Sequence, residues 1–135
     1  DALEEIYETY GYFSESVKSY TLEGKEGMEQ IAGCMQKLRN APPEAFAAIL
    51  VDEYEDYLSG ERISRSGSKT ALTLPKNDTL RWLLADESWI VIRPSGTEPK
   101  LKLYIGARAK TKAELDATLA KLMQDVDARL KGYLA

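Results

Sequence analysis

Apolar residues recur at the three- and four-residue spacing of a helix face in three stretches of the chain. The first stretch predicts a helix over residues 1–10 that ends at Gly11. Its apolar face comprises Leu3, Ile6, Tyr7 and Tyr10. The second stretch predicts a helix that follows a turn bracketed by Gly24 and Gly27 and ends before Pro42-Pro43. Its apolar face comprises Met28, Ile31, Ala32, Met35 and Leu38.

The third helical stretch carries its own start signal. Thr111 and Glu114 stand at the spacing of a capping box, in which each side chain accepts a hydrogen bond from a free backbone N–H group. The apolar face that follows comprises Leu115, Leu119, Leu122, Val126, Leu130 and Tyr133. We therefore expect a helix after Thr111.

The remaining stretches have the composition or the alternation of strands. Residues 12–22 and 47–54 predict two strands, and the acidic pair Glu55-Asp56 follows the second. Three short strands come next, over residues 80–85, 89–92 and 101–105, and they are separated by a turn at 86–88 and a loop at 93–99. Such closely spaced strands predict an antiparallel meander. Residues 59–69 have no periodicity and predict a loop.

The order of these elements predicts an α+β fold, in which an antiparallel sheet has helices packed on one face. The chain of 135 residues, 44% of them hydrophobic and 30% charged, can form a core of its own. It begins at Asp1 without an initiator Met, and we expect a piece of a longer protein. We expect residues 1–11 to be a tail helix of a preceding domain or linker, and residues 12–135 to be one domain.

Composition narrows the chemistry that is open to this chain. The absence of histidine excludes Ser-His, Cys-His and His-metal sites built from these residues alone. A single cysteine, Cys34, excludes an internal disulfide and a paired-cysteine zinc site, and we expect it to be a small core residue. These features favour a reducing compartment, and we expect the cytoplasm. No apolar run approaches the ~20 residues that span a bilayer, so no membrane partner is expected.

Charge is distributed unevenly along the chain. Residues 1–60 carry 13 acidic and 4 basic side chains, a balance of −9, and residues 61–135 carry 9 acidic and 14 basic ones, a balance of +5, which gives the total of −4. An acidic protein is a poor general binder of nucleic acid, so no nucleic-acid partner is expected. The basic second half is compatible with a small anionic ligand.

The loop over residues 93–99, with the sequence RPSGTEP, contains the groups that an anion site needs. Arg93 offers a planar fork of donors that suits two phosphate oxygens. Ser95 and Thr97 supply hydroxyl donors, and Gly96 permits a backbone conformation in which N–H groups converge. The alternative is an ordinary turn with a solvated arginine, since turns favour the same residues.

The residue string itself favours the phosphate site. Arg-Pro-Ser-Gly-Thr-Glu-Pro-Lys over residues 93–100, followed by Leu-Lys-Leu-Tyr-Ile, resembles the C-terminal phosphate-binding loop of the α-D-phosphohexomutases. Residues 86–89 resemble the strand-turn-strand before that loop, and residues 10–13 and 24–27 resemble the stretch that joins the third domain of the family to the fourth. The resemblance covers nearly the whole chain, and it is closest to the phosphoglucomutase and phosphopentomutase branch.

This resemblance implies a fold and a set of substrate ligands. The fold would be that of the phosphoglucomutase C-terminal domain, which is similar to the TATA-binding-protein-like fold. The phosphate of a bound phosphosugar would contact Arg93, Ser95, the Gly96 amide and Thr97. Lys102 matches a position where one branch places an arginine on the same phosphate, and Lys100 is expected to be a solvated flank.

The resemblance also implies what this chain lacks. Family members carry a phosphorylated serine, an Asp-rich loop for Mg²⁺ and a Gly-Glu-x-Ser-Gly loop that reads the sugar, and none of these motifs occurs here. These parts would lie on three preceding domains, so this chain alone is expected to hold no catalytic residue and no metal and to be inactive. The full-length protein would be an intramolecular phosphotransferase of carbohydrate metabolism, a phosphoglucomutase or phosphomannomutase, which interconverts sugar 1- and 6-phosphates through a bisphosphate.

Two other functions stay open from the sequence. One is a stand-alone anion-binding module, and the other is an α+β domain that binds nucleic acid or protein. The sugar is also open among glucose, mannose, glucosamine and pentose phosphates. We interpret Arg65-Ser66-Gly67-Ser68 as a mobile surface loop and the carboxylates of residues 52–56 as a solvated strand end, not a metal cluster.

Overall fold

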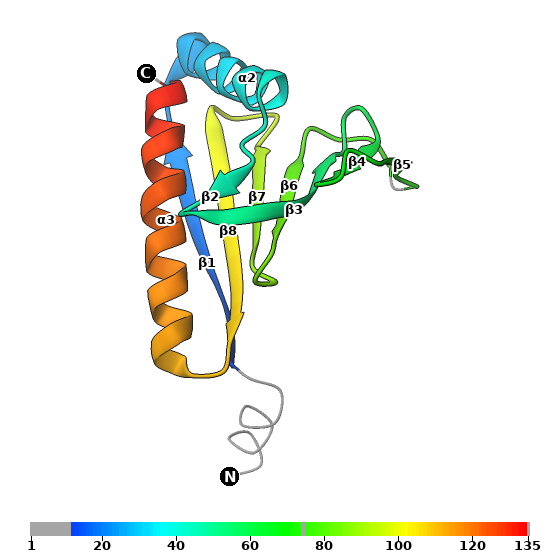
Figure 1. Ribbon diagram of the computed structural model, residues 1–135. Coiled ribbons are helices and arrows are strands. Elements are labelled where there is room, and N and C mark those ends of the chain that lie inside the picture. The colour runs from blue at the N-terminus through cyan, green and yellow to red at the C-terminus, as the bar shows by residue number, and fades with distance from the viewer. Residues whose placement is uncertain (1–11, 74, 135) are drawn as a thin grey trace.

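The computed structural model describes residues 12–73 and 75–134, which form one antiparallel sheet with two helices (Figure 1). The elements are β1 (Tyr12–Thr21), α2 (Gly24–Asn40), β2 (Ala45–Phe46), β3 (Ile49–Asp56), β4 (Glu61–Ser64), β5 (Lys69–Ala71), β6 (Leu80–Leu84), β7 (Trp89–Pro94), β8 (Lys100–Ala109) and α3 (Lys112–Leu134). The helix expected over residues 1–10, and the tail expected over 1–11, lie outside the described residues.

The sheet has the strand order β1-β8-β7-β6-β3-β4-β5, with β2 paired to β3, and every pairing is antiparallel. The expected meander is confirmed as β6-β7-β8, in which Leu80 pairs with Ile92 and Ile92 with Leu103. The strand β1 lies along β8 over ten residue pairs, from Tyr12 with Ala109 to Thr21 with Lys100. The first and last described strands are therefore neighbours.

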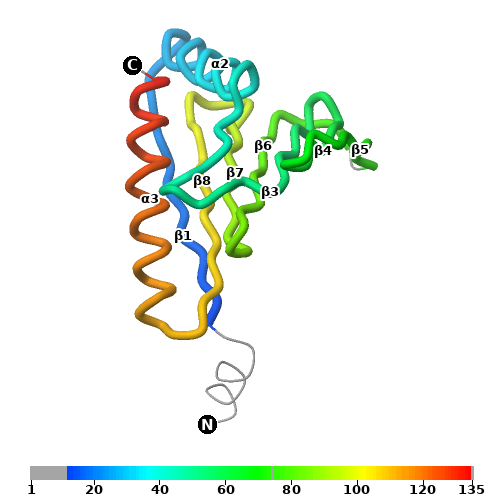
Figure 2. The backbone as a smooth tube through the Cα atoms, viewed as in Figure 1, coloured from blue at the N-terminus to red at the C-terminus, as the bar shows by residue number. Residues whose placement is uncertain are grey.

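Both helices pack on the sheet from one side. α3 lies along β1 and β8, and α2 packs against β8 and α3 near the end of the sheet where β8 begins (Figures 1 and 2). The α+β class with helices on one face is therefore confirmed. Glu114 N–H donates to Thr111 Oγ1 at 3.1 Å, so the expected cap at the start of α3 is present.

The core lies between the helices and one face of the sheet. Alternate residues of the meander are fully buried there, and they join the apolar face of α3 in one cluster that includes Leu122, Val126 and Leu130. Trp82 lies at its centre, with Phe46 edge-on at 5.5 Å and Tyr54 tilted at 5.3 Å between ring centroids. Burying a large apolar side chain stabilises a fold by roughly 1.5–3 kcal/mol, so this face anchors the sheet. Cys34 is also fully buried, as expected, and burial raises the pKa of its thiol to about 11.

Two strand or helix boundaries differ from the expectation. α2 begins at Gly24 rather than after Gly27, since the Gly27 N–H already donates to the Glu23 carbonyl at 2.9 Å. β3 begins at Ile49 rather than at residue 47, because Ala47 and Ala48 form a turn at φ 50° and 65°. Alanine is an unusual residue for such a turn, and an Asp125 carboxylate on α3 accepts the Ala47 N–H at 2.9 Å.

The expected loop over residues 59–69 was wrong in part. Residues of this segment form β4 and the start of β5, and the parts that match the expectation are Ser59 and Gly60 and the turn between the two strands. All three residues of β5 are exposed, and β4 and β5 lie at the edge of the sheet farthest from α3 (Figure 2). Pairing with neighbouring strands makes this segment extended, although the spacing of its apolar residues does not predict a strand.

The solvated strand end expected at residues 52–56 was also wrong for Glu55 and Asp56. β3 extends through both residues, and the Glu55 residue is only 2% exposed. Arg62 and Arg81 approach its carboxylate at 2.7 and 2.6 Å. Burial alone would raise the pKa of Glu55, but hydrogen bonds from these two arginines outweigh burial and hold it below its ordinary value.

Candidate phosphate site

The candidate loop is held by both of its neighbouring strands and by α2. β7 continues through Pro94, so the loop itself covers residues 95–99 rather than the expected 93–99. Ser95 N–H donates to the Lys100 carbonyl at 2.9 Å, and Leu22 N–H donates to the Pro99 carbonyl at 2.8 Å. A Cβ at Gly27 would lie 3.1 Å from Pro99 Cβ, so the first turn of α2 lies close against the loop. The loop is therefore fixed at its base.

The tip of the loop requires a glycine. Gly96 has φ +86°, and a Cβ there would have no atom within 4 Å. The requirement is therefore conformational and not steric. Ser95, Gly96 and Thr97 are all exposed, so their hydroxyl and amide groups are accessible to a ligand.

Arg93 differs from every other arginine that the structure describes. The other six each form an ion pair with a carboxylate, and they are Arg39, Arg62, Arg65, Arg81, Arg108 and Arg129. Arg93 is exposed, and it has no ion pair with any described residue. Its guanidinium is therefore available to an external anion.

Lys102 lies beside Arg93 on the sheet. The two residues are cross-strand partners of β7 and β8, so their side chains project from the same face. Like charges directly opposite each other destabilise a sheet, and here no described carboxylate neutralises either of them. Lys100, by contrast, pairs with Glu98 at 3.5 Å. The pair Arg93 and Lys102 thus forms a local positive site.

A cavity of about 570 Å³ adjoins the loop. One part of its lining is Arg93, Pro94, Ser95 and Gly96, and the other part is Asn77, Asp78 and Thr79. Thr97 and Lys102 are not among the lining residues. The structure therefore brings three of the five expected ligands into one cavity and leaves two beside it.

The segment from Asn77 to Thr79 was not expected at the site from the sequence. A signal for it was present, since an antiparallel meander pairs the start of β6 with the end of β7, as Leu80 and Ile92 do. The residues before Leu80 must then lie near those after Ile92. The polar composition of Asn77-Asp78-Thr79 made this second wall recognisable in principle.

A second cavity, of about 430 Å³, lies at the other candidate motif. Arg65, Ser64 and Gly67 line it together with Asp52, and Arg65 pairs with Asp52 at 3.2 Å. The guanidinium there is already neutralised. The Arg65–Ser68 motif therefore lacks the free cation that the β7–β8 loop presents.

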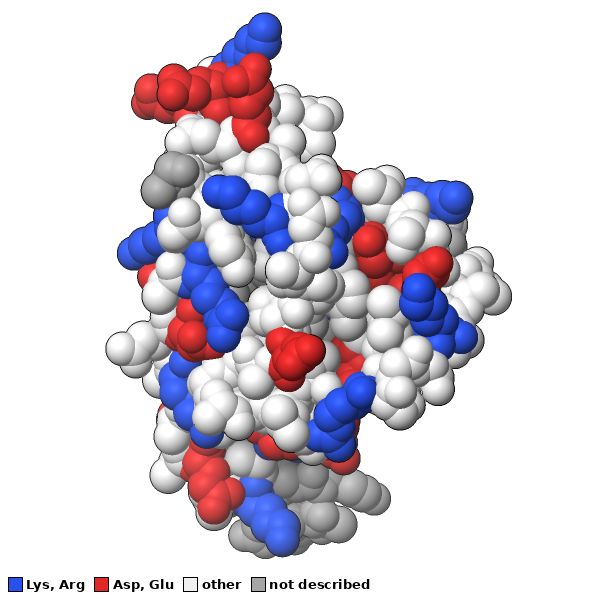
Figure 3. All heavy atoms as spheres, turned by 45° about the horizontal axis from the view of Figure 1, so that its top comes forward, with Lys and Arg blue, Asp and Glu red and all other residues white. Residues whose placement is uncertain are grey.

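On the face shown in Figure 3, basic and acidic side chains are interspersed. The positive charge of the candidate site is that of Arg93 and Lys102, which form no ion pair with a described residue. A small anion suits such a site better than a polyanionic chain does.

Comparison with known proteins identifies the family of this chain. The family described as phosphoglucomutase/phosphomannomutase, C-terminal domain, matches residues 22–125. The chain belongs to this family. It is 42% identical over 109 residues to a phosphoglucomutase of Staphylococcus aureus strain bovine RF122, and 39% identical over 111 residues to that of strain MSSA476. These matches cover 80% and 82% of this chain and 20% of each relative, so the chain spans about a fifth of the phosphoglucomutases it matches.

A solved Paramecium structure, the pp63/parafusin phosphoglucomutase in an open form, is also similar. It has 16% identity and a TM-score of 0.49, and the match covers 97% of this chain and 22% of that one. The expected membership of the phosphohexomutase family therefore rests on the sequence matches, and it is confirmed.

The phosphoglucomutase family implies a metal, and we tested the described residues for a place to hold one. Among residues 12–73 and 75–134, no group of three or more His, Cys, Asp or Glu side chains is arranged to bind a metal ion. The acidic residues of β3 are engaged with arginines instead. No step of the chemistry is therefore assigned to a metal on this domain. No helix in the described part of the chain is long and apolar enough to cross a membrane.

Proposed function

We propose that this chain is the substrate-phosphate-binding domain of a phosphoglucomutase-type enzyme. The observation that carries the proposal is Arg93, which lines the cavity at the β7–β8 loop without an ion pair to any described residue. Ser95, the Gly96 amide and Thr97 would complete the phosphate ligands, and Lys102 would add charge from the next strand. The sequence matches to phosphoglucomutases support this assignment.

The chemistry of the ligands follows from their types. The Arg93 guanidinium can donate two parallel hydrogen bonds to two phosphate oxygens, which the ammonium group of a lysine cannot reproduce. Hydroxyl groups and a backbone N–H recognise oxygen acceptors without reading the shape of a sugar. Such a clamp would accept either phosphate of a bisphosphate intermediate, as interconversion of sugar 1- and 6-phosphates requires.

The remaining parts of the enzyme belong to the protein outside this chain. We infer that residues 12–135 form its C-terminal domain and that residues 1–11 come from a preceding domain or linker. The phosphoserine, the Mg²⁺ site and the sugar-reading loop would lie on preceding domains, which are also the partners of this one. A phosphomannomutase activity falls within the same proposal, and so does a location in the cytoplasm.

Kinetics of the full-length protein test the proposal. We expect Arg93→Ala to lower kcat/KM for glucose 1-phosphate by at least about 10-fold, since a charge-assisted hydrogen bond contributes roughly 1.5–3 kcal/mol. Arg93→Lys should lose less, because it keeps the charge but not the planar fork. Arg65→Ala is the matched control, since Arg65 is already paired with Asp52. An unchanged kcat/KM in Arg93→Ala would contradict the proposal.

The 135-residue chain itself should not turn over sugar phosphate with Mg²⁺ and a bisphosphate primer. It should bind phosphate weakly, on the order of millimolar, because the groups that would hold the sugar lie outside this chain. Amide shifts centred on residues 93–102 and on the facing residues 77–79 would support the site. A full-length protein that binds phosphate here but has no mutase activity would favour the alternative of an anion-binding module.

A further inference from the structure

The second wall of the cavity, Asn77 to Thr79, has no regular secondary structure of its own. Its backbone is attached to the end of β3, where Tyr57 N–H donates to the Thr79 carbonyl at 3.0 Å and Asn77 N–H donates to the Tyr57 carbonyl at 3.3 Å. The Asn77 side chain bonds only locally, to the Pro75 carbonyl at 3.4 Å. The position of Asp78, between these two backbone links, depends on another contact.

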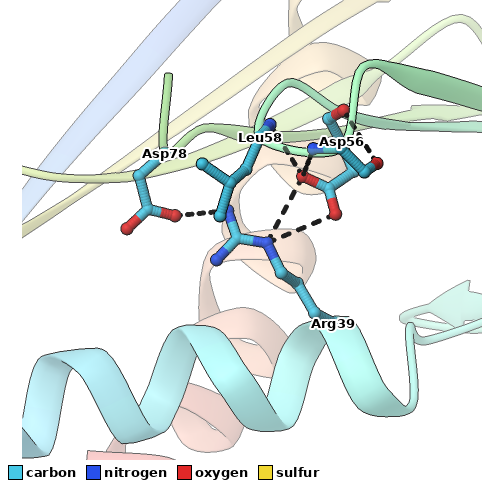
Figure 4. Close-up of polar contacts among 5 residues, drawn as sticks. Arg39, Asp56, Leu58 and Asp78 are labelled. Carbon is cyan, nitrogen blue, oxygen red and sulfur yellow. Dashed lines mark hydrogen bonds and ion pairs between the residues drawn. The ribbon is translucent and has the colours of Figure 1, made fainter. Parts of the chain in front are cut away.

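Arg39 supplies that contact from the last turn of α2 (Figure 4). Its Nη2 donates to Asp78 Oδ1, while its Nε lies 3.3 Å from both carboxylate oxygens of Asp56. Asp56 is itself held, because its Oδ1 accepts the Leu58 N–H at 2.9 Å. The guanidinium therefore connects the fixed end of β3 to the cavity wall.

Burial distinguishes the two carboxylates that Arg39 joins. The side chains of Arg39 and Asp56 are 18% and 12% exposed, whereas that of Asp78 is 43% exposed. The buried half of the contact thus serves as the anchor, and the exposed half lies at the cavity. Burial alone would lower the pKa of Arg39, but Asp78 and Asp56 raise it, so the guanidinium stays charged.

The charges in this arrangement also bear on an anion in the cavity. Asp78 is a carboxylate in the lining of a cavity that also presents Arg93, and it would repel a bound phosphate. The Arg39 guanidinium directly on Asp78 offsets that repulsion. A cavity wall that carried Asp78 without Arg39 would be both less fixed and more negative.

We propose that Arg39 is a positioning residue of the phosphate site, which fixes the Asn77–Thr79 wall through Asp78 and offsets the Asp78 charge. This inference rests on the proposed function only in taking the cavity at Arg93 as the phosphate site. Arg39 does not line the cavity and acts through Asp78.

Titration of the 135-residue chain with inorganic phosphate, followed by amide shifts, tests the inference. We expect Arg39→Gln to weaken phosphate binding about fivefold and to shift the amides of residues 77–79. Arg39→Lys should weaken it less, because it keeps the charge but cannot hold both carboxylates through separate nitrogens. If Arg39→Gln does not fold, the phosphate affinity of Arg39→Lys tests the inference in its place. Asp78→Asn keeps an acceptor for Arg39 and removes the negative charge, so it should bind phosphate at least as tightly as the unmodified chain.

A matched control separates positioning from general stability. Arg129 bonds the Asp125 carboxylate at 3.2 Å and the Ala45 carbonyl at 3.1 Å, away from the cavity lining. Arg129→Gln should lower the Tm without changing phosphate affinity, whereas Arg39→Gln should change both. Equal affinity losses in the two variants would overturn the inference, and so would an Arg39→Lys chain that binds like the unmodified one.

The Arg93→Ala chain distinguishes this inference from the proposed function. If it binds phosphate like the unmodified chain, the proposed site is wrong and the inference is overturned with it. If Arg93→Ala loses binding and Arg39→Gln does not, the inference alone is wrong. Loss of binding in Asp78→Asn would also overturn the inference, since removal of a repelling charge from the cavity should not weaken anion binding.

Discussion

Arg93 differs from the six other described arginines in whether a carboxylate already neutralises its side chain. Arg81 and Arg62 share the buried Glu55, and Arg65 pairs with Asp52. These residues have the same donor chemistry as Arg93, so their type alone does not mark a ligand site. The absence of a described partner is what distinguishes Arg93. At the residue scale, the proposed function rests on which charges the fold leaves without a described partner.

Asp127 is an ion-paired residue whose contribution to the stability of the fold depends on pH. Hydrogen bonds from Lys18, at 2.8 Å, and from Tyr20 lower the pKa of Asp127 from 3.8 to about 2. Because the folded-state value lies below the unfolded one, the contact stabilises the fold fully above about pH 4 and is lost as the pH falls toward 2. Asp127→Asn should therefore lose less unfolding free energy between pH 4 and 2 than the unmodified chain does. Urea unfolding at several pH values checks this, and parallel acid profiles would contradict it.

The β7–β8 strand pair depends on a close contact between an aromatic ring and a glycine. A Cβ at Gly106 would lie 2.0 Å from the ring of Trp89, and the Phe13 ring stacks on Trp89 at 5.3 Å between centroids. Gly106 and Trp89 are cross-strand partners. At the element scale, the absent side chain thus lets the ring pack closely against β8, the strand that begins at the candidate loop.

Gly106→Ala should destabilise the chain by about 1–3 kcal/mol, because the Trp89 ring must move or the strands must separate. Gly33→Ala is the matched control, since a Cβ there meets no atom within 4 Å and the residue lies inside α2. It should be neutral or stabilise by roughly 0.5–1 kcal/mol. Urea unfolding measures the free energy of unfolding of both variants. An equally stable Gly106→Ala chain would show that the ring contact is not a constraint.

Across the whole molecule, burial decreases from the meander to the far edge of the sheet. The inward residues of β6, β7 and β8 are fully buried, whereas all three residues of β5 are exposed. β5 also pairs only with β4, at the end of the strand order. Local opening should therefore be easiest at this edge.

Amide hydrogen exchange should reflect this gradient. We expect the β6–β8 amides to be among the most protected and those of β5 to exchange early. Protection of the meander would also indicate that the base of the β7–β8 loop is rigid, since both of its strands belong to that core. Uniformly fast exchange over residues 80–105 would contradict a single cooperative core.

Much of the fold and part of the site followed from the amino-acid sequence alone. The period-two alternation of Leu80, Trp82 and Leu84 predicted a strand buried on one face, and the cap at Thr111 predicted the start of α3. Gly96 was expected from its place in the loop to adopt a conformation rare for other residues, and it does. These features are local, because each depends on residues within a few positions of one another.

The tertiary structure alone decided which charged groups meet. Glu55 was expected in solvent, yet Arg81, 26 residues away, reaches its buried carboxylate. Arg39 meets Asp78 across 39 residues, and the Asn77–Thr79 wall lies beside Arg93 only because β6 pairs with β7. A sequence pattern records how often apolar residues recur, but it does not record which partner a long polar side chain finds after the sheet and helices have packed. The sequence therefore determined most of the elements and the position of the candidate loop, and the packing of those elements determined which arginine stayed without a described ion pair.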